Sequence, residues 1–256
     1  MPTELQRSML EEDHTLREIV RRLVQTYQPE RIYLFGSQAR GDSGPHSDYD
    51  LLVIVPDDAP PERRQDRFHH KNLWDLEAAA DVLVYSLSYF EARRHLKASL
   101  PGIVLREGKL LYGREKCSTM VDGAARVDDT KAWLRKAEND LKSADHLLDA
   151  SPPFLETALF CCQQAAEKAL KGFLAWHDVP FSKTHIIKEL GRLCVALDAT
   201  LNVSVGPASS LTDYAWKFRY PGGGVLPSLK ETKDAVEIAR ELFKVVLSRL
   251  PGECKP

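Results

Sequence analysis

The sequence predicts an α+β N-terminal half, made of a small mixed sheet with helices, followed by an all-α C-terminal half. Short β-branched runs bounded by Gly, Pro and Ser occur only before residue 113. Beyond residue 129, apolar residues recur at helical spacing. Between these regions, residues 114–128 are polar and lack apolar periodicity. We therefore predict domains over 1–113 and 129–256, joined by a linker over 114–128.

The N-terminal half opens with an amphipathic helix, because apolar residues from Leu5 to Tyr27 recur near helical spacing and Pro29 follows. A polar loop rich in Gly, Ser and Asp, over 36–47, joins the first two strands. Three strands are predicted as short apolar or β-branched runs, over residues 31–35, 48–55 and 81–85. Two further helices are predicted over 60–80 and 88–99, the second with Ser88 as its N-cap.

The C-terminal half is predicted to be a helical bundle. Its candidate helices are separated by segments that contain Pro and Gly, and they cover residues 129–150, 155–177, 183–197, 207–218 and 229–250. Residues 155–177 place small and apolar side chains on one stripe and Gln, Glu and Lys on another, as a bundle helix requires.

Composition excludes several classes of protein. Of 256 residues, 43% are apolar and 28% charged, which is ordinary for a globular chain and excludes wholesale disorder. The net charge of −2 provides no global basic field for nucleic acid and leaves only a local patch open. No apolar run is long enough for a membrane span, so we expect a soluble, cytoplasmic protein without a membrane partner. The five cysteines lack CxxC spacing and are interpreted as reduced core residues.

The stretch that carries chemistry joins the first strand to the second. Phe35-Gly36-Ser37 is followed, after ten residues, by Asp48-Tyr49-Asp50 at the opening of a strand. Residues two apart in a strand project from one face, so both carboxylates can point toward one position. Two adjacent anions are costly without a cation, and Mg²⁺ accepts carboxylate oxygens while it keeps positions for phosphate and water. The pair therefore predicts a metal–nucleotide site.

Other residues complete this predicted site. Gly36 lets the backbone approach a ligand closely, and the amide and hydroxyl of Ser37 can donate to a phosphate. Arg40 either neutralises a phosphate or forms a surface salt bridge, and the sequence favours neither. Asp81, at the head of a later strand, is the candidate third carboxylate.

These residues resemble a known family. Gly36-Ser37, ten residues, then Asp48-x-Asp50, with a later strand aspartate, looks like the polymerase-beta-type nucleotidyltransferase superfamily, specifically its minimal bacterial and archaeal members. The resemblance covers roughly residues 28–112. It implies a polymerase-beta-like fold and an enzyme that transfers a nucleoside monophosphate from a nucleoside triphosphate and releases pyrophosphate.

The same resemblance implies a role for each site residue. Asp48 and Asp50 would bind two Mg²⁺ ions, and Asp81 would complete the metal site and act as base toward an acceptor hydroxyl. Gly36 and Ser37 would hold the triphosphate, with Arg40 beside them. The three aspartates would thus be both catalytic and metal-binding.

A second resemblance covers about residues 129–250. The segment Phe160-x-x-Gln163-Gln164, the later Thr184-His185 and the tetrapeptide Phe218-Arg219-Tyr220-Pro221 look like a HEPN domain. Many HEPN domains are ribonucleases with an Arg followed four to six residues later by His, and no His follows Arg219 here. The sequence is closer to HEPN domains that bind nucleotide or acceptor for a nucleotidyltransferase partner.

Four side chains of this half receive a structural interpretation. Gln163, Gln164 and His185 are interpreted as hydrogen-bonding residues that set the register of the bundle. Lys171 is interpreted as a solvated residue on a polar helix face.

Together the resemblances imply transfer of AMP from MgATP to a hydroxyl acceptor. By analogy with toxin–antitoxin pairs, the acceptor would be a tyrosine of a HEPN half, with Tyr214 and Tyr220 as candidates. Two alternatives stay open: an aminoglycoside-type transferase, and a nucleotide-binding HEPN interaction module without turnover. A homodimer is expected because bundles with apolar stripes often associate.

Overall fold

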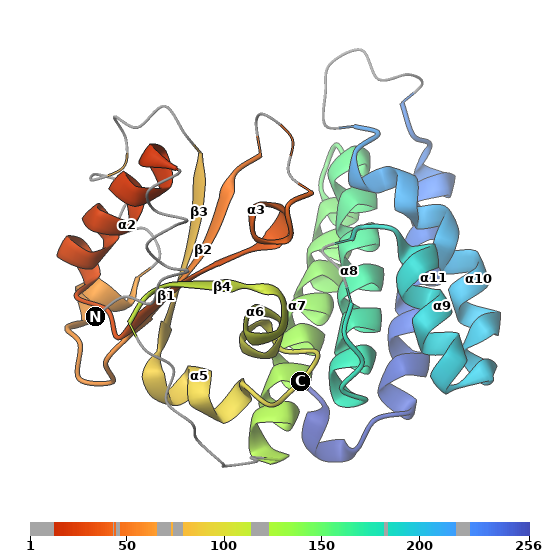
Figure 1. The fold of residues 1–256 in the computed structure, drawn as a ribbon. Coiled ribbons are helices and arrows are strands. Elements are labelled where there is room, and N and C mark those ends of the chain that lie inside the picture. Colours follow the sequence, from red (N-terminus) through yellow and green to blue (C-terminus); the bar gives the residue numbers. More distant parts are fainter. Residues whose placement is uncertain are drawn as a thin grey trace. The chain divides into compact units, whose positions relative to one another are not determined.

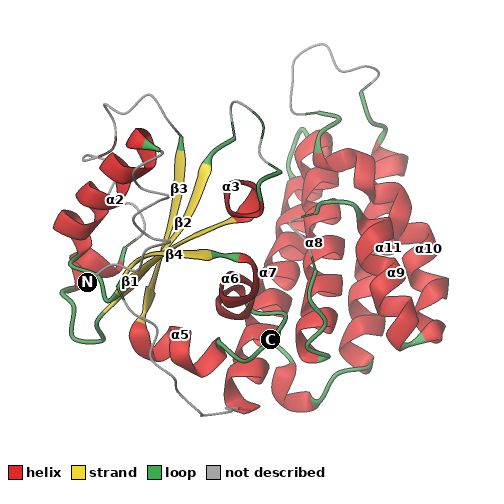
Figure 2. Ribbon diagram, in the orientation of Figure 1, coloured by secondary structure: helices red, strands yellow, loops and turns green. Residues whose placement is uncertain are grey.

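The structure is a computed structural model, and it describes residues 13–42, 44, 47–65, 73, 79–113, 123–181, 184–218 and 226–256. The chain divides into two compact units, Met1–Asp122 and Gly123–Pro256 (Figure 1). The first unit contains a sheet and helices, and the second is built from helices (Figure 2). The predicted order of an α+β half and an all-α half is confirmed.

A four-stranded sheet forms the centre of the first unit. Its strands are β1 (Arg31–Phe35), β2 (Tyr49–Val55), β3 (Ala80–Ser86) and β4 (Lys109–Tyr112), in the spatial order β3-β2-β1-β4. β1 is antiparallel to both β2 and β4, whereas β2 and β3 are parallel. The sequence analysis did not predict β4, because four residues at a sheet edge are too short to show a strand pattern.

Helices cover both faces of the sheet, which explains the continuous apolar run of β2. Leu51, Val53 and Val55 pack with helix α2 (His14–Tyr27) in one core. Leu52 and Ile54 belong to a second core that includes residues of α5 (Leu87–Arg93) and α6 (Leu100–Glu107). Figure 1 shows α2 on one side of the sheet and α5 and α6 on the other.

Several predicted helix boundaries of this unit are corrected. α2 begins at His14 after the cap Asp13, and residues 5–12 of the predicted opening helix lie outside the described part. The helix predicted over 88–99 is instead two helices, since Ser86 caps α5 in place of Ser88, and Ser99 with Pro101 starts α6. Of the helix predicted over 60–80, Pro61–Arg64 forms a 3₁₀ turn and Ala80 belongs to β3, while most of the rest lies outside the described part.

The second unit is a helical bundle, and its long helices run side by side in Figure 1. Its α-helices are α7 (Gly123–Asp149), α8 (Leu155–Trp176), α9 (Ile187–Leu197), α10 (Asn202–Ala208) and α11 (Leu229–Ser248). The helix predicted over 207–218 is replaced by α10 and a 3₁₀ segment, Ser209–Ala215. Gly172 of α8 faces Leu134 of α7, where an added Cβ would lie 3.0 Å from a leucine carbon. Small residues on α8 therefore let these two helices pack closely.

The predicted linker differs from the structure in its second part. Helix α7 begins at Gly123, so residues 123–128 are helical, whereas residues 114–122 lie outside the described part. Ala125 is buried and Arg126 stacks on the ring of Trp176, at 4.8 Å from its centroid. Tertiary packing therefore extends the helix over a stretch with too few large apolar residues to show a helical pattern.

Two expectations from composition can be compared with the described residues. Cys161, Cys162, Cys194 and Cys254 are free thiols, and burial raises the pKa of each. Within the described ranges, no helix combines the length and apolar character that a membrane crossing requires.

Candidate active site

The predicted site residues meet at one edge of the sheet. Because β1 runs antiparallel to β2 while β2 and β3 are parallel, the end of β1 lies beside the starts of the other two strands. Phe35 is the register partner of Asp50, and Asp50 is in turn the partner of Asp81. The turn after β1 and two of the three predicted carboxylates are thus brought together by the pairing of neighbouring strands, although they are far apart in the sequence.

Asp50 and Asp81 share one face of the sheet. Residues two apart in a strand point to the same face, so Asp50 shares a face with Leu52, and Asp81 with Leu83. Both leucines pack in the core under α5 and α6. Asp48 directly precedes β2, two residues before Asp50. Asp48 and Asp81 are exposed and Asp50 is half-buried. The carboxylates are therefore accessible from solvent at the rim of an apolar layer.

Gly36 makes the turn after β1 possible. Its φ is +71°, a region that favours glycine, and an added Cβ would lie 1.9 Å from Oδ2 of Asp50. The carboxylate of Asp50 therefore lies directly against the Gly36 backbone. A short helix, α3 (Gly36–Arg40), follows and ends at Gly41, whose φ is +79°.

Contacts of α3 fix the segment that precedes the aspartates. Nε2 of Gln38 donates to the carbonyl oxygen of Ser47 at 3.1 Å, just before Asp48. Ser37, half-buried, starts the same turn, and its carbonyl accepts from the amide of Gly41 at 2.9 Å. Sequence reasoning assigned no role to Gln38, because only the fold brings it beside Ser47.

Arg40 has an identifiable partner. Its Nε lies 3.2 Å from Oδ2 of Asp42, and both side chains are exposed. Of the two alternatives from the sequence, the structure shows the surface salt bridge. An exposed pair of this kind contributes little to stability, so exchange of Asp42 for a phosphate would cost little.

A hydrogen bond ties β2 to α2 between the two aspartates. The hydroxyl of Tyr49 donates to Oδ2 of Asp13 at 2.8 Å, while Oδ1 of Asp13 accepts from the amide of Leu16 and caps α2. Burial, together with the hydrogen bond to this carboxylate, raises the pKa of Tyr49 to about 12. The sequence alone could have predicted Asp13 as the N-cap of α2, but not its hydrogen bond to Tyr49, 36 residues away.

The carboxylates of this site suit a hard divalent cation whose remaining ligands come from the substrate and water. The described residues contain no group of three His, Cys, Asp or Glu side chains gathered closely enough to hold a metal ion. Mg²⁺ does not need such a cage, since it usually binds through one or two carboxylates together with phosphate oxygens and water. The adjacent pair Asp50 and Asp81 meets that requirement, and Asp48 lies two residues before Asp50.

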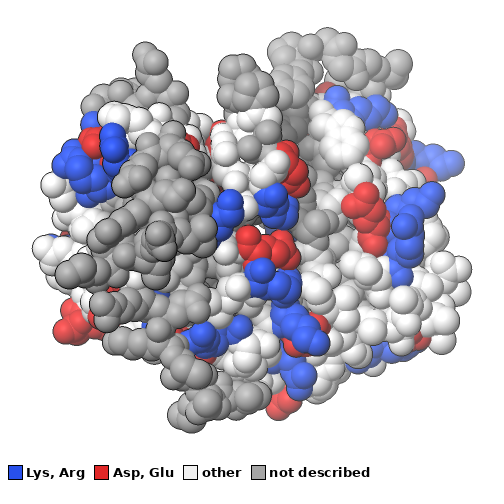
Figure 3. Space-filling model, viewed as in Figure 1, with Lys and Arg blue, Asp and Glu red and all other residues white. Residues whose placement is uncertain are grey.

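Charge on the visible surface follows no single sign. Lys and Arg side chains are interspersed with Asp and Glu over the face shown in Figure 3. This agrees with the small net charge of the chain.

In the second unit, the predicted hydrogen-bonding residues surround a buried carboxylate. Glu167 is 3% exposed and accepts from Lys171 at 2.7 Å and from Gln163 at 2.9 Å, with Nδ1 of His185 at 3.1 Å. Burial by itself would raise the pKa of Glu167, but these partners outweigh it and the pKa lies below its ordinary value. The interpretation of Lys171 as solvated is wrong, because that side chain is buried and paired.

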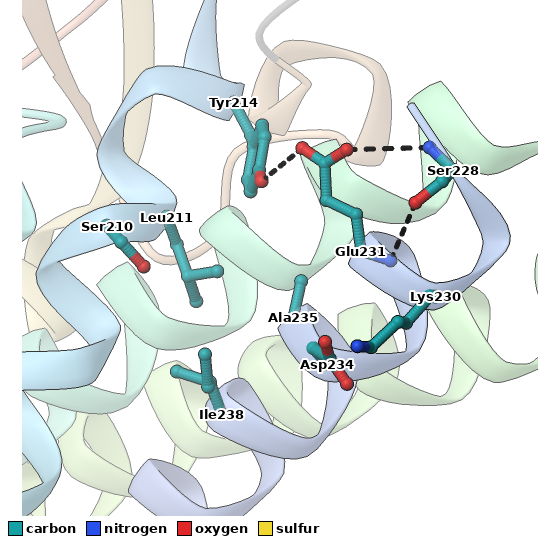
Figure 4. Close-up of a pocket in the computed structure, with 9 residues that line it drawn as sticks. All are labelled: Ser210, Leu211, Tyr214, Ser228, Lys230, Glu231, Asp234, Ala235 and Ile238. Carbon is teal, nitrogen blue, oxygen red and sulfur yellow. Dashed lines mark hydrogen bonds between the residues drawn. The ribbon is translucent and has the colours of Figure 1, made fainter. Parts of the chain in front are cut away.

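Of the two candidate acceptor tyrosines, only Tyr214 lies within the described residues. The hydroxyl of Tyr214 donates to Oε1 of Glu231 at 2.8 Å, and Glu231 also completes the capping box of α11 with Ser228 (Figure 4). Burial and this carboxylate raise the pKa of Tyr214 to about 12. Tyr220, like Arg219, lies outside the described residues.

The chain thus combines an α+β domain that carries adjacent carboxylates with a helical domain. Comparison with protein families matches residues 15–110 to the Nucleotidyltransferase domain and residues 130–250 to the HEPN domain. The chain is therefore a nucleotidyltransferase domain fused to a C-terminal HEPN domain, as its motifs predicted.

Solved structures with likeness to the chain cover about half of it. One is the crystal structure of ST0689, an archaeal HEPN homologue, with 24% identity and a TM-score of 0.38 over 47% of this chain and 96% of that one. Another is TT1696 from Thermus thermophilus, with 25% identity and a TM-score of 0.40 over 47% of this chain and 98% of that one. Comparison with curated proteins gave no match.

Proposed function

We propose that the N-terminal domain transfers a nucleoside monophosphate, AMP from ATP in complex with Mg²⁺, to a hydroxyl acceptor. One observation carries this proposal: Asp50 and Asp81 are register partners beside a glycine turn whose backbone lies against Asp50. A purely structural pair of aspartates would not need an adjacent glycine turn whose backbone lies against one of the carboxylates.

Each site residue has a distinct task in this proposal. Asp48 and Asp50 would hold Mg²⁺, which when bound neutralises the charge of the phosphates. The amide and hydroxyl of Ser37 would donate to the triphosphate, and Arg40 would exchange Asp42 for a phosphate oxygen. Asp81, which is exposed, would accept the proton of the acceptor hydroxyl as its oxygen attacks the α-phosphate and pyrophosphate leaves.

A tyrosine acceptor, in a toxin–antitoxin-like setting, would need help to ionise. The raised pKa of Tyr214 disfavours its phenolate at neutral pH, so attack by this oxygen would need Glu231 or Asp81 to take the proton. Mass spectrometry of the intact chain after incubation with MgATP would show one added AMP, and peptide mapping would distinguish Tyr214 from Tyr220. An unchanged mass would exclude self-modification and leave an external hydroxyl as acceptor.

The enzymatic proposal itself is tested with labelled nucleotides. Purified chain is incubated with Mg²⁺ and each of ATP, GTP, CTP and UTP, and pyrophosphate release and label transfer are measured. Asp50→Asn and Asp81→Asn keep side-chain shape but remove charge, so we expect activity to fall by about 10³-fold or more, as loss of several kcal/mol at a metal site implies. Asp58→Asn, an exposed aspartate away from the site, is the matched control. Equal activity in Asp50→Asn and the control would refute the assignment.

A further inference from the structure

A hollow in the HEPN domain has the size of a small-molecule site. Its volume is about 450 Å³, within the usual range for ligand pockets. Glu156, Phe160 and Gln164 of α8 line one side, and His185 and Trp216 lie among the other lining residues. None of these five belongs to the nucleotidyltransferase domain, and the proposed transfer reaction does not use them.

The hydrogen-bond network behind the hollow determines how Gln164 is oriented. Both N–H groups of Gln163 are used, one toward the Glu167 carboxylate at 2.9 Å and one toward the carbonyl of His185 at 3.1 Å. These two contacts fix the orientation of the Gln163 amide. Its Oε1 therefore faces Gln164 and accepts a hydrogen bond from Nε2 of Gln164 at 2.7 Å. Gln164 consequently keeps its carbonyl oxygen and one N–H for a ligand.

The same network sets the tautomer of His185. Its Nδ1 lies 3.1 Å from Oε2 of Glu167, a carboxylate whose pKa is lowered and which can only accept. Nδ1 of the neutral ring must then carry the proton, and Nε2 is left as an acceptor. The side chain of His185 is 66% exposed and lines the hollow.

A carboxylate and exposed aromatic rings also line the hollow, and they favour a ligand that is positively charged and carries N–H donors. The exposed Glu156 brings a carboxylate, and Phe160 and Trp216 remain 40% and 46% exposed, which leaves ring surface for a ligand. Tyr214 and Phe218 also line the hollow, and they already hold a cation of the chain, since Nζ of Lys217 lies 5.2 Å from the Phe218 centroid and 5.8 Å from that of Tyr214. Among the described residues, no cation lies over the ring of Phe160 or Trp216.

We infer that this hollow binds a small organic cation that carries N–H donors, such as an ammonium, amidinium or guanidinium group. The cation packs on Phe160 and Trp216 and donates to Glu156, Nε2 of His185 and Oε1 of Gln164. A neutral ligand of the same shape loses the attraction to Glu156 and to the ring faces, and an anion is repelled. The inference requires neither ATP nor turnover, so it stands or falls apart from the proposed transfer reaction.

Three planar probes that differ mainly in charge test this inference. Benzamidine is cationic, benzamide is its neutral analogue and benzoate is the anion, and each is titrated calorimetrically into the full chain without nucleotide or Mg²⁺. We expect benzamidine to bind about tenfold more tightly than benzamide, and benzoate to show no binding. Glu156→Gln should weaken benzamidine about fivefold to tenfold and leave benzamide unchanged, and Trp216→Ala should weaken both.

The residues that are substituted in this test are exposed, so their replacement should not affect folding. Glu156 and Trp216 are exposed, and Glu241→Gln on the exposed surface of α11 is the matched control, which should bind benzamidine as the wild type does. Benzamidine that binds no more tightly than benzamide, or that is insensitive to Glu156→Gln, would overturn the inference. Adenosine that binds more tightly than benzamidine and displaces it would also overturn it, because the hollow would then recognise a base and not a cation.

Discussion

The two domains use carboxylates in opposite ways. Glu167 is buried, and Lys171, Gln163 and His185 from the same domain compensate its charge. Asp48 and Asp81 are exposed, and among the described residues neither forms an ion pair with Lys or Arg. A buried carboxylate whose partners lie within the chain needs no ligand, and loss of one partner is costly, whereas adjacent carboxylates where strands begin gain most from a cation that arrives with the substrate. The following changes test this contrast, from the largest expected effect to the smallest.

Among these further changes, Gly36→Ala should have the largest effect on activity. The added Cβ would lie 1.9 Å from Oδ2 of Asp50, so the carboxylate or the turn must move, and a displacement of about 1 Å costs on the order of 10²-fold in rate. Pyrophosphate release under MgATP measures the loss. Gly41→Ala is the control, because its φ is also positive but its added Cβ would contact nothing within 4 Å. If both variants lose activity equally, backbone strain is the cause and the contact with Asp50 is irrelevant.

Glu167→Gln should destabilise the HEPN domain. It leaves the buried Lys171 ammonium without its anionic partner, which costs about 3 kcal/mol, and urea unfolding of the full chain measures this. Glu241→Gln, on an exposed surface, should be neutral. Because the folded pKa of Glu167 lies below the ordinary 4.5, its ionisation contributes stability above that pH. The difference between variant and wild type should therefore shrink as pH falls from 4.5 through the folded pKa, and a constant difference would contradict the ionic explanation.

Tyr49→Phe should have an intermediate effect. Loss of the hydrogen bond to Asp13 costs about 1 kcal/mol of stability and loosens the start of β2, so we expect activity to fall about threefold to tenfold. Asp13→Asn and the double variant complete a cycle with both readouts. Effects that simply add would show that this hydrogen bond does not position the aspartates. Tyr112→Phe, an exposed tyrosine on β4, is the control.

Arg40→Gln should have the smallest effect. The exposed pair with Asp42 contributes little to the fold, so thermal stability should not change measurably. If Arg40 contacts a phosphate of the substrate, KM for ATP should rise about fivefold while kcat changes little. Unchanged KM and kcat would leave Arg40 as a surface salt-bridge residue only.

The sequence by itself determined the features that depend on local spacing. The sequence predicted a strand over 48–55 with Asp48 and Asp50 at its start, and β2 begins one residue later, so Asp50 lies in the strand and Asp48 directly before it. The loop predicted after the first strand does begin at Gly36, whose φ is +71°. The apolar stripes beyond residue 129 predicted the bundle, since a helix shows its buried face in a 3.6-residue period. These patterns were readable because neighbouring residues generate them.

Tertiary structure alone decided which distant residues meet. The register that pairs Asp50 with Asp81, the bond from Tyr49 to Asp13 and the enclosure of Glu167 by Lys171 depend on strand order and helix packing. The start of α7 at Gly123 and the break between α5 and α6 were likewise set by packing and capping. Local propensity is weak beside the free energy of burial, so partners far apart in sequence and the ends of helices follow from the assembled core.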